Sequence, residues 1–166
     1  MTNNKSGCCA GGCGCGCAPG KQVIIDFMYI DLTVCDRCLG TEGALDAAVA
    51  AVSPALSAAG YGITVNKQLI ASAEQAAALG FVSSPTIRVN GRDIADVDET
   101  RCDACGDLCG CDVDCREWHY NGESFDAPPQ ALIAEAILKL FALPPVTPPP
   151  CDLPGNLAAF FQGRQS

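Results

Sequence analysis

The segment VIIDFMYI, at residues 23–30, is followed after a short turn by Cys35-Asp36-Arg37-Cys38, and this succession decides the fold. The first segment is an apolar run of strand length, and the C-x-x-C pair follows where the chain enters a helix. The first N–H groups of a helix have no partner within it, and the helix dipole adds partial positive charge there. A thiol at this position loses its proton more readily, and the thiolate is both a nucleophile and a metal ligand. The segment therefore predicts thiolate chemistry, through either one disulfide or one soft metal ion.

The composition excludes two classes of partner. The 166 residues, 49% of them hydrophobic, suffice for one domain with appendages. The 10 basic and 19 acidic side chains give a net charge of −9, which repels phosphate backbones, so we expect no nucleic-acid partner. The apolar stretches are too short to cross a bilayer, so we expect no membrane partner.

Cysteine is the anomaly of the composition, with 13 in the chain. In a secreted protein, so many cysteines would indicate a disulfide framework. Residues 1–20 contain no apolar run that could serve as a signal peptide, which argues against secretion. The odd count also leaves at least one thiol unpaired. We therefore expect a cytoplasmic protein whose thiols are reduced or bound to metal.

Three parts of the chain differ in composition. Residues 1–20 are rich in Gly and Cys with almost nothing apolar to bury, so they predict a flexible tail unless a metal gathers their thiols. Residues 21–143 show the periodicities of a folded domain, interrupted by a cysteine-rich insert at 101–115. Residues 144–166 indicate a proline-rich linker and a C-terminal tail.

The domain is expected to alternate strands and helices. Asn90-Gly91 between alternating residues is the strongest hairpin signal, and Ser72 followed by Gln75 is a capping-box pattern that opens a helix. The other expected elements are a helix over 40–59, a strand over 61–66, a strand at 118–120 with a turn at Asn121-Gly122, and a helix from Pro128-Pro129 to Phe141.

This order of elements resembles the thioredoxin fold, in which a cis-proline loop lies beside the C-x-x-C. By that resemblance Pro85 is the cis-proline, and Ser84 offers backbone groups to a bound partner. The C-x-x-C pair, the segment SPTIRVNG at 84–91 and the cysteine-rich insert together resemble a thioredoxin-like bacterial family, a domain of unknown function. Its members are often found beside arsenic- and mercury-resistance genes. The resemblance covers about residues 21–143 and implies an α/β, thioredoxin-like three-layer fold.

The insert offers five thiols in the pattern C-x-x-C-x-x-x-C-x-C-x-x-x-C. Four thiolates can close a tetrahedral zinc shell, and the first pair has the usual knuckle spacing. An iron–sulfur cluster also takes four cysteines, but this spacing matches neither ferredoxin pattern. Two local disulfides, or a zinc ion that only holds the loop, would also account for the pattern. We expect zinc or another thiophilic metal, with an iron–sulfur cluster as an alternative, at Cys102, Cys105, Cys109, Cys111 and Cys115.

Isolated residues add little to this pattern. His119, the only histidine, is expected to be a strand residue rather than a ligand, and Trp118, Phe160 and Phe161 are expected to pack in the core. Cys151 stands alone after a stiff proline spacer that could return it to the C-x-x-C as a third thiol.

The leading hypothesis is the binding or transfer of thiophilic metal or metalloid ions through clustered thiolates. Cys35 is expected to be the more exposed, activated thiolate, and Cys38 completes or resolves the bond. Soft sulfur ligands select arsenite, mercury, copper(I) or zinc over magnesium. The partners expected are the ion itself and a redox or metal-transfer protein.

Two alternatives stay open. In a thiol–disulfide oxidoreductase, Cys35 attacks a substrate disulfide, Cys38 resolves the mixed disulfide, and Pro85 lies beside the pair. In a zinc-stabilised interaction domain, the C-x-x-C has no chemical role and its cysteines can be replaced without consequence.

Overall fold

β1 (Lys21–Tyr29) lies inside a four-stranded sheet whose order is β2-β1-β3-β4. It pairs in parallel with β2 (Tyr61–Leu69) and antiparallel with β3 (Thr86–Val89), and β4 (Arg92–Asp93) pairs antiparallel with β3. The computed structural model describes residues 20–165, so the tail expected at the N-terminus falls almost wholly outside the described residues. Within that range the protein has the mixed α/β architecture expected from the sequence.

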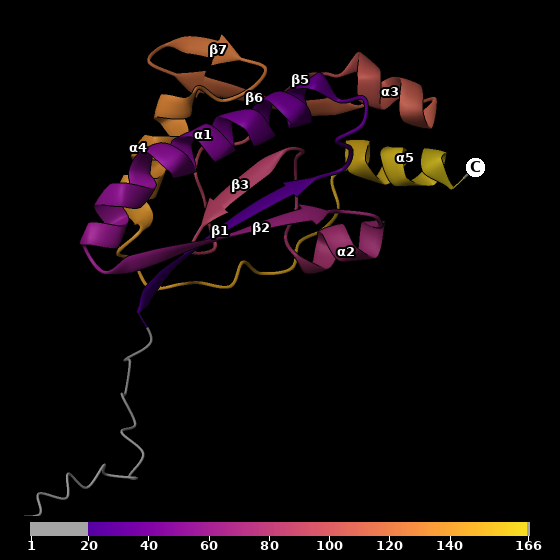
Figure 1. Cartoon of the computed structure of the whole chain (residues 1–166). Helices are drawn as coiled ribbons and strands as arrows, with labels where there is room; N and C mark the ends of the chain where they lie inside the picture. Colours follow the sequence, from indigo (N-terminus) through magenta and orange to yellow (C-terminus); the bar gives the residue numbers. More distant parts are fainter. Residues whose placement is uncertain (1–19, 166) are drawn as a thin grey trace, which may run out of the picture.

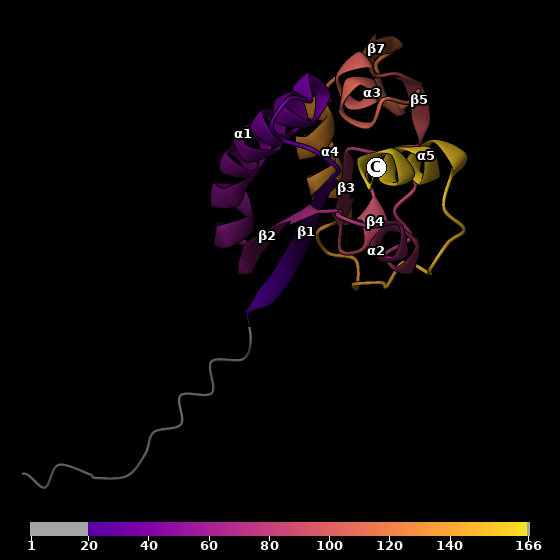
Figure 2. The same ribbon diagram turned by 90° about the vertical axis from the view of Figure 1, so that its right-hand side faces the viewer.

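Two helices cover one face of this sheet (Figures 1 and 2). α1 (Asp36–Ala58) and α4 (Gln130–Leu140) pack on each other and on β1, where Val23, Ile25 and Phe27 are fully buried. These three alternate along the strand because successive side chains point to opposite faces of a sheet. Burial of each contributes about 1.5–3 kcal/mol, which makes this cluster a main source of the fold's stability.

The cysteine-rich insert belongs to a second sheet beside the first. β5 (Asp98–Arg101), β6 (Asp114–Tyr120) and β7 (Glu123–Phe125) pair antiparallel in that order, and α3 (Asp103–Cys109) connects β5 to β6. Arg116 on β6 is fully buried, and its guanidinium donates to both carboxylate oxygens of Asp93 on β4, at 2.8 and 2.9 Å. The guanidinium also lies over the ring of Trp118, 4.4 Å from its centre. Because a forked guanidinium–carboxylate pair allows few orientations, it fixes the two sheets relative to each other.

The C-terminal segment returns along the molecule and ends in a helix. Residues 144–154 form no helix or strand, but Val146 N–H donates to Asn90 O and Cys151 N–H to Ala77 O, each at 3.0 Å. The second of these bonds holds the segment against α2 (Ala73–Ala78). α5 (Gly155–Arg164) follows and packs beside α3, as Figures 1 and 2 both show. Its Phe160 and Phe161 are buried, so their expected packing role is confirmed.

Both hairpins predicted from Asn-Gly pairs are present. Asn90-Gly91 joins β3 to β4 with φ of 51° and 80°, and Asn121-Gly122 joins β6 to β7 with φ of 51° and 82°. Two successive positive φ values are typical of the type I′ turn, which suits strand twist. Among residues 20–165, none of the helices combines the length and apolar character needed to cross a membrane.

Candidate metal centre

Four cysteines from distant parts of the chain meet beside the start of α1. The Sγ atoms of Cys35, Cys102, Cys105 and Cys115 all lie within 4.8 Å of one another. Cys35, Cys105 and Cys115 are fully buried, and Cys102 is 5% exposed. The group is therefore a set of four soft donors enclosed by the core.

Helix starts and one strand position these thiols. Cys35 is the N-cap residue of α1 and Cys102 is the N-cap residue of α3, and neither side chain caps its own helix. Cys105 lies in the first turn of α3, and Cys115 lies on β6 opposite Thr100 of β5. Both N-cap thiols are therefore free to point toward the other two sulfurs instead of toward their own backbone.

The sulfur positions fit one tetrahedral ion. A Zn–S bond of about 2.3 Å puts two thiolates of a tetrahedral site roughly 3.8 Å apart. The Sγ atoms of Cys105 and Cys115 are 3.5 Å apart, and no pair in the group exceeds 4.8 Å. An iron–sulfur cluster attaches its cysteines to more than one iron, which spreads the sulfurs further. The donor set therefore suits a single soft ion better than a cluster.

The four thiols differ in how readily they ionise. Hydrogen bonds, first from Cys102 and then from Cys105 and Cys115, lower the pKa of Cys35 far below its ordinary value despite its burial. Hydrogen bonds from Cys105 and Cys115 also lower the pKa of Cys102, to about 7. Hydrogen bonding to Cys102 in turn raises the pKa of Cys105 and of Cys115. A metal ion bound to the four sulfurs would remove these differences in pKa, because every thiol that ligates a metal is deprotonated.

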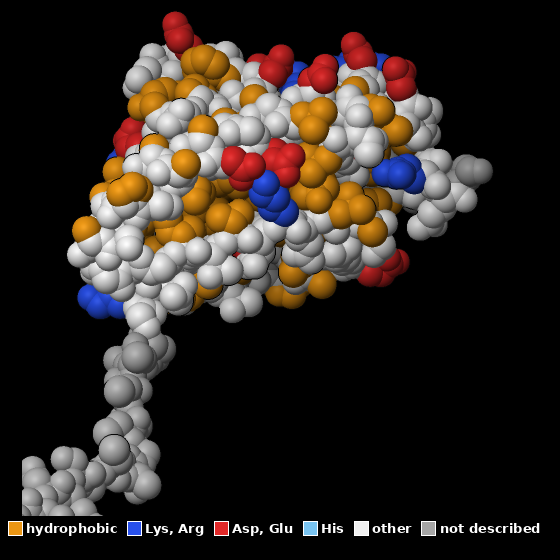
Figure 3. Space-filling model, viewed as in Figure 1, with side chains coloured by type: hydrophobic (Ala, Val, Ile, Leu, Met, Phe, Trp, Pro, Cys, Tyr) orange, Lys and Arg blue, Asp and Glu red, His pale blue; other side chains and the backbone are white. Residues whose placement is uncertain are grey.

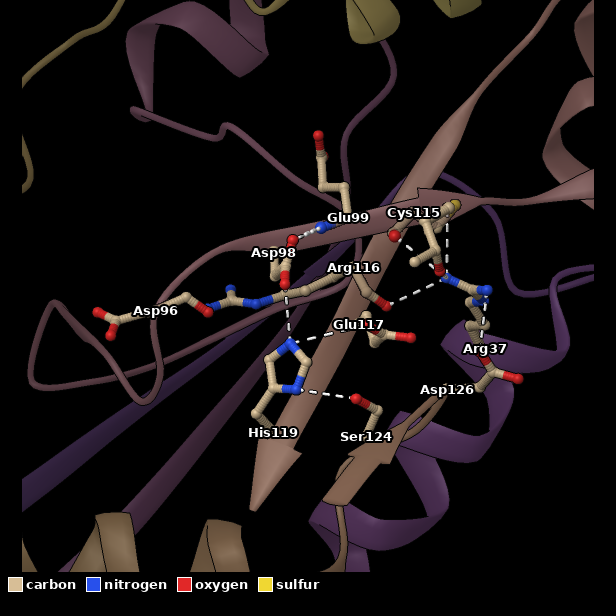
Figure 4. Close-up of polar contacts among 11 residues, drawn as sticks. Arg37, Asp96, Asp98, Glu99, Cys115, Arg116, Glu117, His119, Ser124 and Asp126 are labelled. Atoms are coloured by element: carbon tan, nitrogen blue, oxygen red, sulfur yellow. Dashed lines mark hydrogen bonds and ion pairs between the residues drawn. The ribbon is translucent and has the colours of Figure 1, made fainter. Parts of the chain in front are cut away.

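Arg37 ties the start of α1 to the second sheet (Figure 4). Its guanidinium donates to Thr100 Oγ1 at 2.7 Å and to Cys115 O at 3.1 Å, and it pairs with Asp126 at 2.8 Å. These acceptors are oxygens rather than the sulfur of Cys35. Arg37 therefore positions the backbone that carries Cys115.

Cys38, the second cysteine of the C-x-x-C, stays outside the four-thiol group. Its Sγ lies 3.6 Å from Ser84 Oγ, and the Ser84–Pro85 peptide bond is cis, as predicted. Hydrogen bonding to Cys35, together with burial, raises the pKa of Cys38 and keeps it a thiol. The carbonyl of Ser84, expected to serve a bound partner, accepts a hydrogen bond from Arg116 N–H at 2.8 Å. Cys38 is thus hydrogen-bonded to Cys35 but lies outside the four-thiol group.

The structure divides the cysteines of the insert. Cys102, Cys105 and Cys115 join Cys35, whereas Cys109 and Cys111 form a disulfide with each other. Of the five cysteines expected as ligands, Cys109 and Cys111 therefore lie outside the four-thiol group.

The structure also shows the surroundings of Cys35 and Cys151. Cys35 was expected to be the more exposed thiol; it is fully buried, because α1 begins at the next residue and the insert covers it. Cys151 is half-buried beside α2 and is not part of the four-thiol group.

α5 closes the site from the other side. Leu157, Phe160 and Phe161 belong to the same buried cluster as the four cysteines. Asn156 anchors the start of the helix by donating to Asp114 O at 3.0 Å. Gly163 lies directly against the carbonyl of Cys109, where a Cβ would have no room. The helix therefore packs closely on α3 and belongs to the same buried cluster as the thiols.

Sequence reasoning missed two parts of this site. The spacing of Leu157, Phe160 and Phe161 follows the i, i+3, i+4 pattern of a helix face and could have revealed α5. No comparable signal links Cys35 to the thiols of the insert, because tertiary packing alone brings them together.

Comparison with known proteins gives one match. Residues 23–137 match the family model described as "Domain of unknown function (DUF2703)". The four clustered cysteines and Cys38 lie inside this span, whereas α5 lies outside it. No curated protein and no solved structure matches the chain. Since the matched span exceeds half of the sequence, the protein belongs to the DUF2703 family, whose shared domain has no known function.

Proposed function

We propose that the protein binds one thiophilic metal ion through the thiolates of Cys35, Cys102, Cys105 and Cys115. The observation that carries this proposal is the convergence of four buried sulfur atoms within 4.8 Å. Sulfur ligands select soft or borderline ions, and zinc commonly takes four cysteines in a tetrahedral shell. Zinc is therefore the ion that fits this donor set best.

The burial of the four thiols indicates a structural rather than a catalytic role for the ion. Structural zinc sites have a closed shell of four protein ligands, whereas catalytic sites keep one position open. Because residues of α5 share the buried cluster of the thiols, we expect that helix to slow release of an ion. The function supported best is therefore tight binding of the ion, and transfer to a partner protein would be helped by displacement of α5. A zinc-stabilised interaction domain is compatible with the same site.

The proposal extends to a thioredoxin-like fold, to further soft ions and to a reducing compartment. A thioredoxin-like architecture is supported by parallel β1 and β2, antiparallel β3, a C-x-x-C at the start of α1, and a cis bond at Pro85 before β3. The resemblance to proteins encoded beside arsenic- and mercury-resistance genes extends the proposal to arsenite and mercury as ions for these thiolates. A reducing compartment such as the cytoplasm would keep the thiols available.

One observation favours a second function, thiol–disulfide exchange. Cys35 and Cys38 are hydrogen-bonded to each other at the start of α1, as a reactive pair would be. Two observations weigh against it. Both thiols are fully buried, and the carbonyl of Ser84 is already bonded to Arg116. A substrate disulfide would have to displace part of the second sheet.

Elemental analysis of the full chain, purified without oxygen, tests metal binding. We expect an equivalent of soft metal that can be replaced by Co²⁺ with intense thiolate-to-cobalt absorption. Cys102→Ser should lose this equivalent. Cys151→Ser is the matched control, because Cys151 lies outside the four-thiol group, and it should keep the metal. Equal metal content in the two variants would show that the ion is bound elsewhere and that the proposal is wrong.

A further inference from the structure

We propose a second metal site, of different chemistry, formed by Asp98, Glu117 and His119 on the exposed face of the second sheet. One ligand atom from each residue lies within 4.8 Å of the others. An imidazole nitrogen with two carboxylate oxygens suits a borderline divalent ion of the first transition row, such as Zn²⁺ or Co²⁺. This site shares no residue with the four-thiol group, and the inference does not depend on it.

Neighbouring strands set the geometry of the three ligands (Figure 4). Asp98 on β5 lies directly opposite Glu117 on β6, and His119 follows two residues later on the same face. The Nε2 atom of His119 is 2.9 Å from Asp98 Oδ2 and 3.6 Å from Glu117 Oε2. Because paired strands rather than a loop carry the ligands, their arrangement is held before any ion arrives.

Hydrogen bonds to neighbouring residues orient two of the ligands, His119 and Asp98. His119 Nδ1 lies 3.0 Å from Ser124 Oγ, and Ser124 lies opposite His119 on β7. This contact turns Nε2 toward the two carboxylates. Asp98 Oδ1 accepts a hydrogen bond from Glu99 N–H at 3.0 Å, which leaves Oδ2 for the site. Partners of this kind orient metal-ligating histidines and carboxylates in proteins.

The charge of the group favours a divalent cation. Carboxylates directly opposite each other on neighbouring strands repel. Within residues 20–165, the ion pairs that Asp98 and Glu117 make are both with His119, and one imidazolium can balance only one of the two charges. Acidic side chains also gather along the edge formed by the second sheet and α3, which attracts cations (Figure 3).

The site is open to solvent. The side chains of His119 and Asp98 are 49% and 62% exposed, so an ion can enter directly and keep positions for water or another ligand. This openness distinguishes it from the closed thiol group and makes rapid exchange of the ion the expected behaviour.

Titration of the full chain with Co²⁺ in reducing buffer tests the inference by NMR. His119 is the only histidine, so hyperfine-shifted imidazole protons can come from one residue alone. We expect such shifted signals on binding at this site. Thiolate-to-cobalt absorption reports on cysteine ligands and not on His119, so failure of this inference is recognised independently of the four-thiol group.

Variants of a ligand, of the serine that orients His119 and of a control acid complete the test. Asp98→Asn should weaken Co²⁺ binding at His119 by at least 10-fold, and Ser124→Ala by about 10-fold. Glu123→Gln removes an exposed acid of the same hairpin outside the trio and should leave binding unchanged. Absence of shifted imidazole signals at millimolar Co²⁺, or equal affinities in the Asp98 and Glu123 variants, would overturn the inference.

Discussion

Cys35 and Cys38 lie one helical turn apart at the start of α1, and besides the hydrogen bond between them their sulfur atoms have different partners. Cys35 Sγ lies among the thiols of Cys102, Cys105 and Cys115, whereas Cys38 Sγ lies 3.6 Å from Ser84 Oγ. Only Cys35 belongs to the four-thiol group, and Cys38 lies outside it. Mutation of each cysteine can therefore test metal binding and thiol–disulfide exchange separately.

Serine substitutions at the two positions should have different effects. Cys35→Ser should abolish metal binding at the four-thiol group, since it removes one of four ligands. Cys38→Ser should keep the metal, with affinity only weakened, as measured by elemental analysis of both variants. If the protein is instead an oxidoreductase, Cys38→Ser should trap a mixed disulfide with a disulfide substrate, visible by mass spectrometry.

Removal of the metal should lower the melting temperature. An ion that binds only the folded state stabilises it by about 2.7 kcal/mol at 100 times its dissociation constant. For a domain of this size that corresponds to a shift of roughly 5–10 °C. Calorimetry with and without a chelator measures the shift, and Cys102→Ser supplies the control because it should show none. An equal response in that variant would contradict metal binding by the thiols.

A methyl group at Gly163 should speed release of the ion. Gly163 lies against the carbonyl of Cys109, so Gly163→Ala should push α5 away from α3 and open the thiols to a chelator. Gly155→Ala is the matched control, because it lies in the same helix with nothing within 4 Å of the added carbon. Stopped-flow chelation should show several-fold faster release in the first variant alone. Equal rates would mean that α5 does not limit access.

Loss of Arg37 should destabilise the fold more than loss of Arg101. Arg37→Ala leaves buried backbone oxygens beside Cys115 without their donor, which costs about 1–3 kcal/mol. Arg101 forms ion pairs with Asp103 and Asp112 on the surface and is 61% exposed, so solvent screens these pairs and Arg101→Ala should have a much smaller effect. Urea unfolding midpoints compare the two, and a reversed order would contradict the anchoring role of Arg37.

Local patterns predicted β1, β2, α1, α2, α4 and both hairpins, but they did not predict β5, α3, α5 or the four-thiol group. The Asn-Gly pairs imply positive φ values and hence both hairpins, and the C-x-x-C marks the start of α1. The meeting of Cys35 with the insert depends on how the second sheet docks on the first. Arg116 and Asp93 fix that docking, and a pair formed by residues on different strands has no sequence periodicity to reveal it. The ligand set could therefore be identified only as far as the insert.

A metal held by the four thiols would also act on the topology of the chain. Cys35 caps the start of α1, while Cys102 and Cys105 come from the segment joining β5 to β6 and Cys115 lies on β6 itself. An ion bound to all four would close a loop that contains β2, α2, β3 and β4. A cross-link that closes a loop of this size restricts the unfolded chain by on the order of 4 kcal/mol. Three of the four strands of the first sheet would then lie inside a closed loop of chain, and loss of the ion would open that loop.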